Sequence, residues 1–366
     1  MREAGRIRYG FVSVVYGGAF TRLMADVTLP TNLSPGNLPA LAEDAEVTFH
    51  IYATHASQSM LRATPAFSTL ETFARVIFHD IGSESIANAS SPYEVLSACH
   101  QRAIRIARER DEALVVLSPD AIWSDGSFAR MHEIVKQGAR AVMMASPRAS
   151  KSAFLGELSN YTEQGDDASL SISHRDLMAC MLDNLHPYSE NLLWREDRTS
   201  SWPSQLYWRA GKQEMLVRAF HLHPLVVRPT NWDTAIPETI DGRFVAAAVA
   251  NRSDIHVVRD SDEIAACEMT NTLESRAHLV TPNRESGTKR IAAWMRRATD
   301  ALHREYVELP IRLHAGPLDS AAEARFQQCE RESARVLACI QRDYRALEKP
   351  PAATRTGDRP HVATQP

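Results

Sequence analysis

The chain has few cysteines, no long apolar run and no excess of charge of one sign. Its five cysteines are scattered between Cys99 and Cys339 without a CxxC pair, which indicates reduced thiols rather than a zinc or redox motif. No apolar run approaches the roughly 18 to 20 residues that a membrane helix requires, and the N-terminus has no signal-like apolar segment. The sequence therefore predicts no integral membrane segment and, by default, a cytoplasmic protein.

The charge balance argues against a nucleic-acid-binding protein, and the length allows a well-buried core. The 41 basic and 45 acidic residues are well mixed and give a formal net charge of −4, so no basic surface for nucleic acid is expected. With 366 residues, 44% of them hydrophobic, the chain can bury one large core or two smaller ones without disulfides.

The first 147 residues alternate between apolar strands and amphipathic helices. Strands are predicted at 6–16, 46–53, 75–80, 114–117 and 140–145, and helices at 19–29, 67–73, 93–109 and 127–138. The strand at 114–117 is apolar at every position, which is typical of a parallel sheet covered on both faces. The pattern predicts an α/β fold with a doubly wound, mostly parallel sheet.

The rest of the chain is less regular. A helix is expected at 173–185, residues 188–245 are rich in Trp, Pro and His with little periodicity, and further helices are expected at 260–271, 288–308 and 320–347. These features divide the chain into a first domain at 1–250, a mainly helical C-terminal extension at 251–348 and a disordered tail at 349–366. The long charged final helix is either a solvated surface helix or a means of self-association.

An acidic turn follows the most apolar strand. Ser118-Pro119-Asp120 comes directly after Leu117, so Asp120 is expected at the carboxyl end of a strand, where open α/β sheets bind ligands. A carboxylate there can hold a divalent cation or a sugar hydroxyl. The alternative is an ordinary turn, because Pro, Asp and Gly are all common turn residues.

Two histidines occupy alternate positions of a second apolar run. Within residues 218–227, which predict a strand, His221 and His223 should emerge on one face about 6 to 7 Å apart and could share a metal ion or an anion. The alternative is that one packs in the core and the other is exposed. Three carboxylates, Asp233, Glu238 and Asp241, follow closely.

The order of these elements resembles that of the GT-A-fold glycosyltransferases, which use a nucleotide sugar. The resemblance covers roughly residues 8 to 250. It rests on the strand 12–16 ending in a turn, the helix containing 100–104, the aspartate motif ending at Asp120, the late histidines and the segment 202–208, which resembles an acceptor-side segment. The usual DxD motif has an acid where this chain has Ser118.

The resemblance implies a site and a reaction. A divalent cation, Mn²⁺ or Mg²⁺, would be held by Asp120 with His221 or His223, although Ser118 in place of the first acid puts metal dependence in question. The partners implied are a nucleotide sugar and an acceptor, which could be a glycan, a lipid carrier, a protein or a small metabolite. A cation beside the leaving diphosphate would lower the barrier to sugar transfer.

Further residues are assigned by the same reasoning. An inverting reaction needs a carboxylate base near the acceptor hydroxyl, and Asp241, Asp233 and Glu238 are the candidates, with Asp241 preferred. Tyr16, Gly17 and Gly18 are suited to the nucleotide, or else form a bare tight turn. Two other functions remain open: a nucleotide-sugar-binding protein without turnover, and a metal-dependent hydrolase built on the histidine pair.

Overall fold

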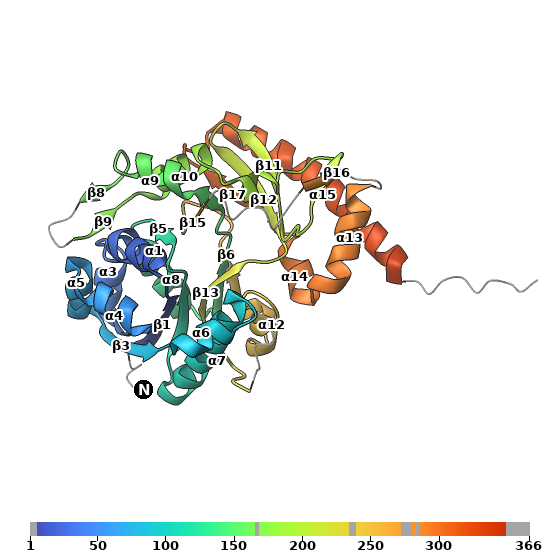
Figure 1. Cartoon of the computed structure of the whole chain (residues 1–366). Helices are drawn as coiled ribbons and strands as arrows, with labels where there is room; N and C mark the ends of the chain where they lie inside the picture. The colour runs from blue at the N-terminus through green and yellow to red at the C-terminus, as the bar shows by residue number, and fades with distance from the viewer. Residues whose placement is uncertain (1–5, 165–167, 234–238, 272–279, 283–285, 349–366) are drawn as a thin grey trace, which may run out of the picture.

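The protein is described from a computed structural model, which covers residues 6–348 apart from 165–167, 234–238, 272–279 and 283–285. The predicted tail at 349–366 and Glu238 therefore lie outside the described residues. Figure 1 shows a large α/β body, with smaller sheets and the C-terminal helices packed along one edge of it.

A seven-stranded sheet forms the centre of the body. Its order is β14-β6-β13-β4-β1-β2-β3, and every pair is parallel except the two that β13 makes with β4 and β6. The strands are β1 (Ile7–Val15), β2 (Ala45–Ala53), β3 (Arg75–Asp80), β4 (Ala113–Leu117), β6 (Ala141–Met144), β13 (His223–Val227) and β14 (Ile255–Val257). The predicted α/β fold with a doubly wound, mostly parallel sheet is confirmed.

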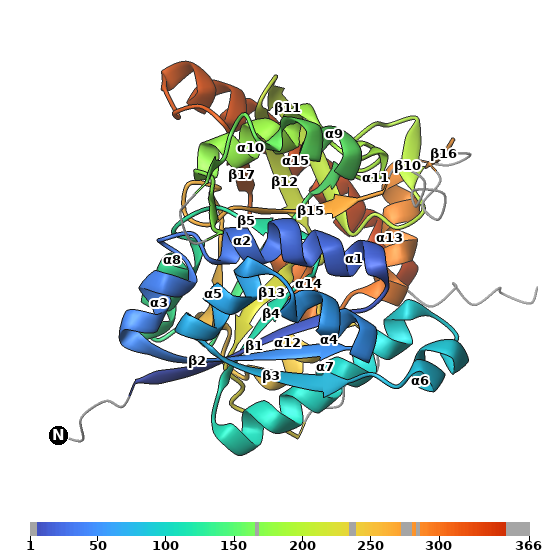
Figure 2. The same ribbon diagram turned by 60° about the vertical axis from the view of Figure 1, so that its left-hand side comes forward.

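Helices cover both faces of this sheet, as Figure 2 shows. On one face lie α1 (Gly18–Leu23), the π-helical turn η1 (Met24–Thr28), α2 (Leu29–Asn32), α3 (Leu38–Asp44), α4 (His55–Arg62), α5 (Pro65–Phe73) and α8 (Ser127–Lys136). On the other lie α6 (Ser83–Asn88), α7 (Pro92–Arg110) and α12 (Phe244–Ala248). Phe11, Phe49 and Phe128 are fully buried on the first face, while Val12, Ala103 and Phe244 belong to the core of the second.

Smaller sheets complete the fold. A three-stranded sheet has the order β5 (Ala121–Trp123), β15 (Ala266–Thr270), β7 (Arg148–Ser150), and another has the order β11 (Gln205–Gly211), β12 (Glu214–Ala219), β17 (Ile311–His314). Two strand pairs join β8 (Glu163–Gln164) to β9 (Leu170–Ser171) and β10 (Arg198–Ser200) to β16 (Val280–Pro282). The remaining helices are α9 (Lys151–Leu158), α10 (His174–Asp183), α11 (Pro187–Glu190), the 3₁₀ turn η2 (Arg252–Asp254), α13 (Gly287–Ala298), α14 (Ala301–Tyr306) and α15 (Ser320–Glu348).

The C-terminal helices pack on the β11-β12-β17 sheet. Phe326, Leu337 and Ile340 of α15 join Leu216 of β12 and Ile291 of α13 in a separate core cluster. The segment 251–348, predicted to be mainly helical, thus contains α13, α14 and α15, but it also gives β14 to the main sheet and β15 and β17 to the smaller ones. Self-association through α15 stays a prediction.

Three local predictions are wrong. Residues 218–227 do not form one strand, because the chain leaves the β11-β12-β17 sheet after Ala219 and enters the main sheet at His223. Residues 260–271 form a turn and β15 rather than a helix, because pairing with β5 and β7 outweighs the local helical pattern. The irregular region 188–245 contains four paired strands, β10, β11, β12 and β13. In the part of the chain that the structure describes, no helix has both the length and the hydropathy needed to cross a bilayer.

Candidate active site

The site lies at the edge of the main sheet where β1 and β4 end. These two strands are parallel, with Ser13 opposite Leu117, so Tyr16 and Ser118 leave the sheet at the same edge. Because β13 runs the other way, its first residue, His223, lies at that edge too, opposite Met144 near the end of β6. Crevices at the carboxyl ends of parallel strands are the usual ligand sites of such sheets.

Asp120 is half-buried at this edge in a turn fixed on three sides. The Ser118 hydroxyl donates to Asp120 Oδ1 at 2.6 Å, and the Thr28 hydroxyl donates to the Pro119 carbonyl oxygen at 2.9 Å. The Asp120 carbonyl oxygen accepts from the Met269 N–H at 2.9 Å. The motif is therefore an ordered turn that holds one carboxylate in position, and Ser118 is a hydrogen-bond donor to that carboxylate.

The β5-β15-β7 sheet brings Glu268 and Arg148 beside Asp120. Glu268 is opposite Ala121 in the antiparallel pair and opposite Arg148 in the parallel pair. Arg148 Nε lies 3.4 Å from a Glu268 carboxylate oxygen, and its guanidinium lies 4.7 Å from the ring centroid of Tyr188. One cation and two acids from three separate segments thus share a half-buried region.

The carboxylates perturb one another. Burial and the charge of Glu268 together raise the pKa of Asp120 to about 6, against the Ser118 hydrogen bond and the charge of Arg148. Burial also raises the pKa of Glu268, a rise that Arg148 opposes and the charge of Asp241 supports. The charge of Glu268 thus acts on Asp120 and the charge of Asp241 acts on Glu268, while Arg148 contacts Glu268. Perturbed carboxyls of this kind are typical of functional sites.

The predicted base candidates Asp241 and Asp233 lie in different environments, and Glu238 lies outside the described residues. Asp241 is half-buried, its charge acts on Glu268 and His223, and its backbone carbonyl oxygen lies 3.4 Å from His303 Nε2. Asp233 is exposed and forms an ion pair with Arg108 at 2.6 Å. Of the candidates within the described residues, Asp241 is the one whose charge acts on Glu268.

The predicted histidine pair does not assemble. His221 Nε2 lies 2.9 Å from the Ala298 carbonyl oxygen, whereas His223 Nε2 lies 2.9 Å from the Val116 carbonyl oxygen. The common face fails because the two residues belong to no common strand. Burial lowers the pKa of His223, which favours the neutral imidazole, and a proton on Nε2 would be donated to the carbonyl oxygen.

Tyr16, Gly17 and Gly18 form the turn between β1 and α1. Gly17 has φ of +81°, which favours glycine, and nothing lies within 4 Å of the place where a Cβ would stand. Its carbonyl oxygen accepts from the Thr21 N–H and hydroxyl, both at 3.0 Å. Tyr16 is half-buried against the core, and burial raises its pKa. The turn therefore needs Gly17 for its backbone conformation and leaves open space beside it.

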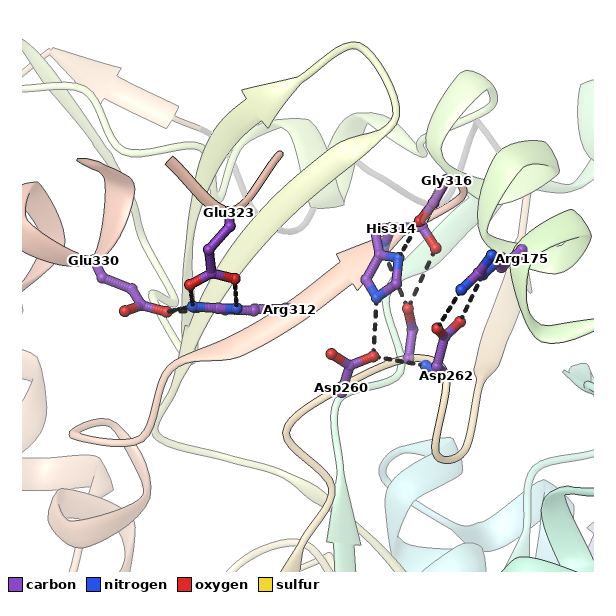
Figure 3. A network of polar contacts seen from close by, with 9 residues as sticks. Arg175, Asp260, Asp262, Arg312, His314, Gly316, Glu323 and Glu330 are labelled. Carbon is purple, nitrogen blue, oxygen red and sulfur yellow. Dashed lines mark hydrogen bonds and ion pairs between the residues drawn. The ribbon is translucent and has the colours of Figure 1, made fainter. Parts of the chain in front are cut away.

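A different group of residues has the spacing of metal ligands. Within the described ranges, Asp260, Asp262 and His314 are the one set of at least three His, Cys, Asp or Glu residues whose ligand atoms all lie within 4.8 Å of one another. Figure 3 shows that protein groups already occupy them. His314 Nε2 lies 2.9 Å from Asp260, its Nδ1 lies 2.6 Å from the Gly316 carbonyl oxygen, and Arg175 binds Asp262 through two nitrogens.

This cluster is accordingly an internal network. The hydrogen bonds to Asp260 and Gly316 raise the pKa of His314 against the effect of burial, and an imidazole that donates from both nitrogens has no lone pair for a metal ion. The chemistry of the donors at the sheet edge is different. Asp120, Glu268 and Asp241 offer carboxylate oxygens, the ligands preferred by Mg²⁺ and Mn²⁺, although the ligand atoms of these three residues do not all lie within 4.8 Å of one another.

Sequence reasoning missed Glu268 and Arg148. Glu268 stands in the run 264–269, where it is the one charged residue among apolar and small ones. A lone acid in such a run is a signal of a buried functional carboxylate, but the local pattern of 260–271 predicts a helix, which gives no reason to place Glu268 beside Asp120. Arg148 had no comparable signal, because it lies in a three-residue strand.

Comparisons with known proteins give likenesses of fold. No family model matches the chain, and no curated protein matches its sequence. The crystal structure of residues 1–349 of TarS from S. aureus is 10% identical with a TM-score of 0.37, covering 93% of this chain and 73% of that one. The apo form of mouse xyloside xylosyltransferase 1 is 12% identical with a TM-score of 0.29, covering 42% and 59%.

A third likeness is to the galactosyltransferase LgtC in complex with donor and acceptor sugar analogues. It is 11% identical with a TM-score of 0.28, covering 88% of this chain and 95% of LgtC. The chain spans 22% of a longer TarS structure and 59% of the mouse enzyme.

Proposed function

We propose that the protein is a glycosyltransferase that moves a sugar from a nucleoside-diphosphate sugar to an acceptor hydroxyl. The observation that carries the proposal is the group of Asp120, Glu268 and Asp241 at the carboxyl edge of a mostly parallel sheet. Ligands of such sheets bind at this edge. Half-buried carboxylates there can accept hydrogen bonds from sugar hydroxyls and can hold a divalent cation beside a diphosphate.

On the donor side, Asp120 and Glu268 are the residues that would hold a divalent cation. When bound, such a cation would offset the negative charge that grows on the leaving diphosphate. Ser118 holds the Asp120 carboxylate in one orientation through its 2.6 Å hydrogen bond. Arg148 restrains Glu268 and reduces the repulsion between the two acids.

Tyr16 and the Gly17-Gly18 turn are proposed as the nucleotide side of the site. They follow β1, the strand next to the one that precedes Asp120. The open space beside Gly17 leaves the backbone accessible to a ligand. A half-buried tyrosine offers an aromatic face and a hydroxyl to a base or ribose.

Asp241 is proposed as the base that takes the proton of the acceptor hydroxyl. Its charge is felt by both Glu268 and His223, which supports a location at the same edge. Asp233 suits this role less well, because it is exposed and bound to Arg108. A base must lie within hydrogen-bond reach of the hydroxyl that it deprotonates.

The proposal is tested by thermal shift with UDP, GDP, CMP and TDP, each with and without Mn²⁺. A ligand that binds only the folded state raises the Tm, by an amount that corresponds to about 2.7 kcal/mol at a concentration one hundred times Kd. We expect one nucleotide to raise the Tm and Asp120→Asn to remove the rise. Glu133→Gln on α8 is the matched control, since Glu133 is exposed and pairs with Arg130. If no nucleotide raises the Tm, the proposal fails.

Binding without turnover is the second candidate, and Ser118 favours it, because the site has one acid fewer in this turn than a DxD motif supplies. A transferase and a binding protein without turnover are distinguished by an assay for free sugar released from the nucleotide sugar with the highest affinity. Slow hydrolysis that Asp241→Asn abolishes supports a transferase. Tight binding without hydrolysis or transfer supports the binding protein.

A further inference from the structure

Trp202 is a large aromatic side chain held rigidly at the surface. It is 41% exposed, yet its ring meets Trp294 edge-on at a centroid distance of 5.4 Å and His221 at 6.2 Å. Its backbone N–H donates to the Ser200 hydroxyl at 3.2 Å, and its carbonyl oxygen accepts from the Ser204 N–H at 2.9 Å. A ring fixed in this way can bind a partner with little loss of side-chain entropy.

A chain of contacts connects Trp202 to the proposed base. The His221 ring, which meets Trp202, also lies 4.5 Å from the ring of His303 between centroids, and His303 Nε2 lies 3.4 Å from the Asp241 carbonyl oxygen. Figure 1 shows α14, which carries His303, beside β13 and α12. Two ring contacts and one hydrogen bond therefore separate the exposed tryptophan from Asp241.

An unsatisfied donor lies inside the same aromatic cluster. Trp294 is 3% exposed, and its indole Nε1–H has no hydrogen-bond partner among the residues that the structure describes. Its ring contacts Trp202, His221 and Phe220. Buried donors in native proteins are nearly always paired, so this N–H calls for an acceptor beyond the described residues.

We propose that the acceptor is a carbohydrate and that Trp202 is the platform on which one of its sugar rings stacks. This inference rests on the proposed function and names the substrate class of its acceptor side. The C–H face of a pyranose is apolar while its rim carries hydroxyls, so stacking on an indole face buries apolar area and gains dispersion energy.

The test measures sugar binding and nucleotide binding separately on the full chain. Wild type and variants are applied to an array of immobilised mono- to tetrasaccharides of glucose, galactose and N-acetylglucosamine, and the best binder is then titrated in solution by tryptophan fluorescence. Trp202→Phe keeps a flat ring, Trp202→Leu keeps apolar area without one, and Trp194→Leu is the control. Trp194 stacks on Trp208 at 6.3 Å, outside this cluster. Thermal melts and nucleotide-induced shifts verify that each variant is folded.

We expect saturable binding of at least one oligosaccharide, about 10-fold weaker in Trp202→Leu, as for a central aromatic residue of an interface, and much less affected in Trp202→Phe and Trp194→Leu. Nucleotide shifts should be equal in all four proteins. The inference is overturned if no saccharide binds, or if Trp202→Leu binds as tightly as wild type. Absence of any nucleotide shift would instead refute the proposed function and leave a sugar-binding result at Trp202 standing.

Discussion

Arg148 and Glu268 stand opposite each other in the parallel β7–β15 pair, and Arg148 Nε lies 3.4 Å from a Glu268 carboxylate oxygen. On the other side of β15, Glu268 is opposite Ala121 of β5, the residue that follows Asp120. A small three-stranded sheet thus brings an acid to Asp120 from residues nearly 150 positions later. The charged surroundings of Asp120 and Glu268 therefore depend on the pairing of β15 with β5 and β7.

Replacing Asp120 with Asn should separate stability from function. Burial and the charge of Glu268 raise the pKa of Asp120 to about 6, so the folded state disfavours the charged form that prevails at pH 7. We expect Asp120→Asn to raise the free energy of unfolding at pH 7 by on the order of 1 kcal/mol and to abolish nucleotide-sugar turnover. Urea denaturation at pH 7 and at pH 4.5 measures the first effect. The gain in the free energy of unfolding should be smaller at pH 4.5, where Asp120 is protonated in the folded protein. An equal gain at pH 7 and at pH 4.5 would contradict the electrostatic cause.

Replacing Glu268 with Gln should change how Asp120 titrates. The Glu268 charge is one of the two causes that raise the Asp120 pKa, and Arg148 would no longer be paired with a carboxylate. The pKa of Asp120 should therefore fall, and the pH at which nucleotide-induced stabilisation is half-maximal should move to lower pH. Carboxyl NMR titration of wild type and Glu268→Gln measures the Asp120 pKa directly. Glu133→Gln is the control, and an unchanged Asp120 pKa in Glu268→Gln would show that the two charges do not interact.

Two buried histidines should make the fold sensitive to acid. Burial lowers the pKa of His79 and of His100 to about 4 in each case, and the charge of His50 adds to the effect at His79. The unfolded chain takes up these protons near pH 6.5, so the free energy of unfolding falls as the pH decreases from about 6.5 to 4. Each group contributes at most about 3.5 kcal/mol to this fall, since one pKa unit corresponds to about 1.4 kcal/mol.

The variant His79→Gln keeps a polar side chain beside His50 but cannot gain the charge. Its stability should fall less steeply than that of wild type between pH 6.5 and 4, as measured by urea denaturation across that interval. His55→Gln is the control, because His55 is exposed and pairs with Asp80 at the surface. Parallel curves for wild type and His79→Gln would rule out His79 as a source of the acid sensitivity.

Arg312 should be the main polar anchor of α15. Figure 3 shows its guanidinium bound to both Glu323 and Glu330, at 2.7 Å and 2.8 Å for the shortest contacts. Arg312→Leu would leave two partly buried carboxylates facing each other without a cation, at a cost of about 2 kcal/mol. The free energy of unfolding of Arg312→Lys should lie between those of wild type and Arg312→Leu, because an ammonium cannot form the forked pairs.

Chemical denaturation with matched measurements on Arg342→Leu tests this anchor. Arg342 is also on α15, but its side chain is 71% exposed and its pair with Asp343 is 3.5 Å long, so its loss should cost less than about 0.5 kcal/mol. Equal losses in Arg312→Leu and Arg342→Leu would mean that the fork contributes no more than an ordinary surface pair.

The main sheet could be predicted because its strands carry their own signals. The apolar run at 114–117 and the β-branched and aromatic residues of 7–15 indicate strands wherever they pack. β15 carries no such signal, since Ala266, Cys267 and Met269 suit a helix as well as a strand. Its conformation is decided by pairing with β5 and β7, which are distant in sequence.

The site divides in the same way. The apolar strand before it predicts the turn at Asp120. The predicted common face of the two histidines is wrong, because an alternation of two residues has meaning only if both lie on one strand. His221 and His223 lie on either side of the passage between two sheets, and each imidazole binds a different carbonyl group.

By itself, the sequence determined the α/β class, the strand order along the chain and the placement of Asp120 at a strand end, because these depend on local hydrophobic pattern and turn chemistry. Only the tertiary structure decided which charges meet. Glu268 and Arg148 reach Asp120 through strand pairing across long sequence separations, and the charge of Asp241 acts on Glu268. The raised pKa of Asp120 arises from burial and from the nearby charge of Glu268. Long-range electrostatics of this kind have no local pattern in the sequence.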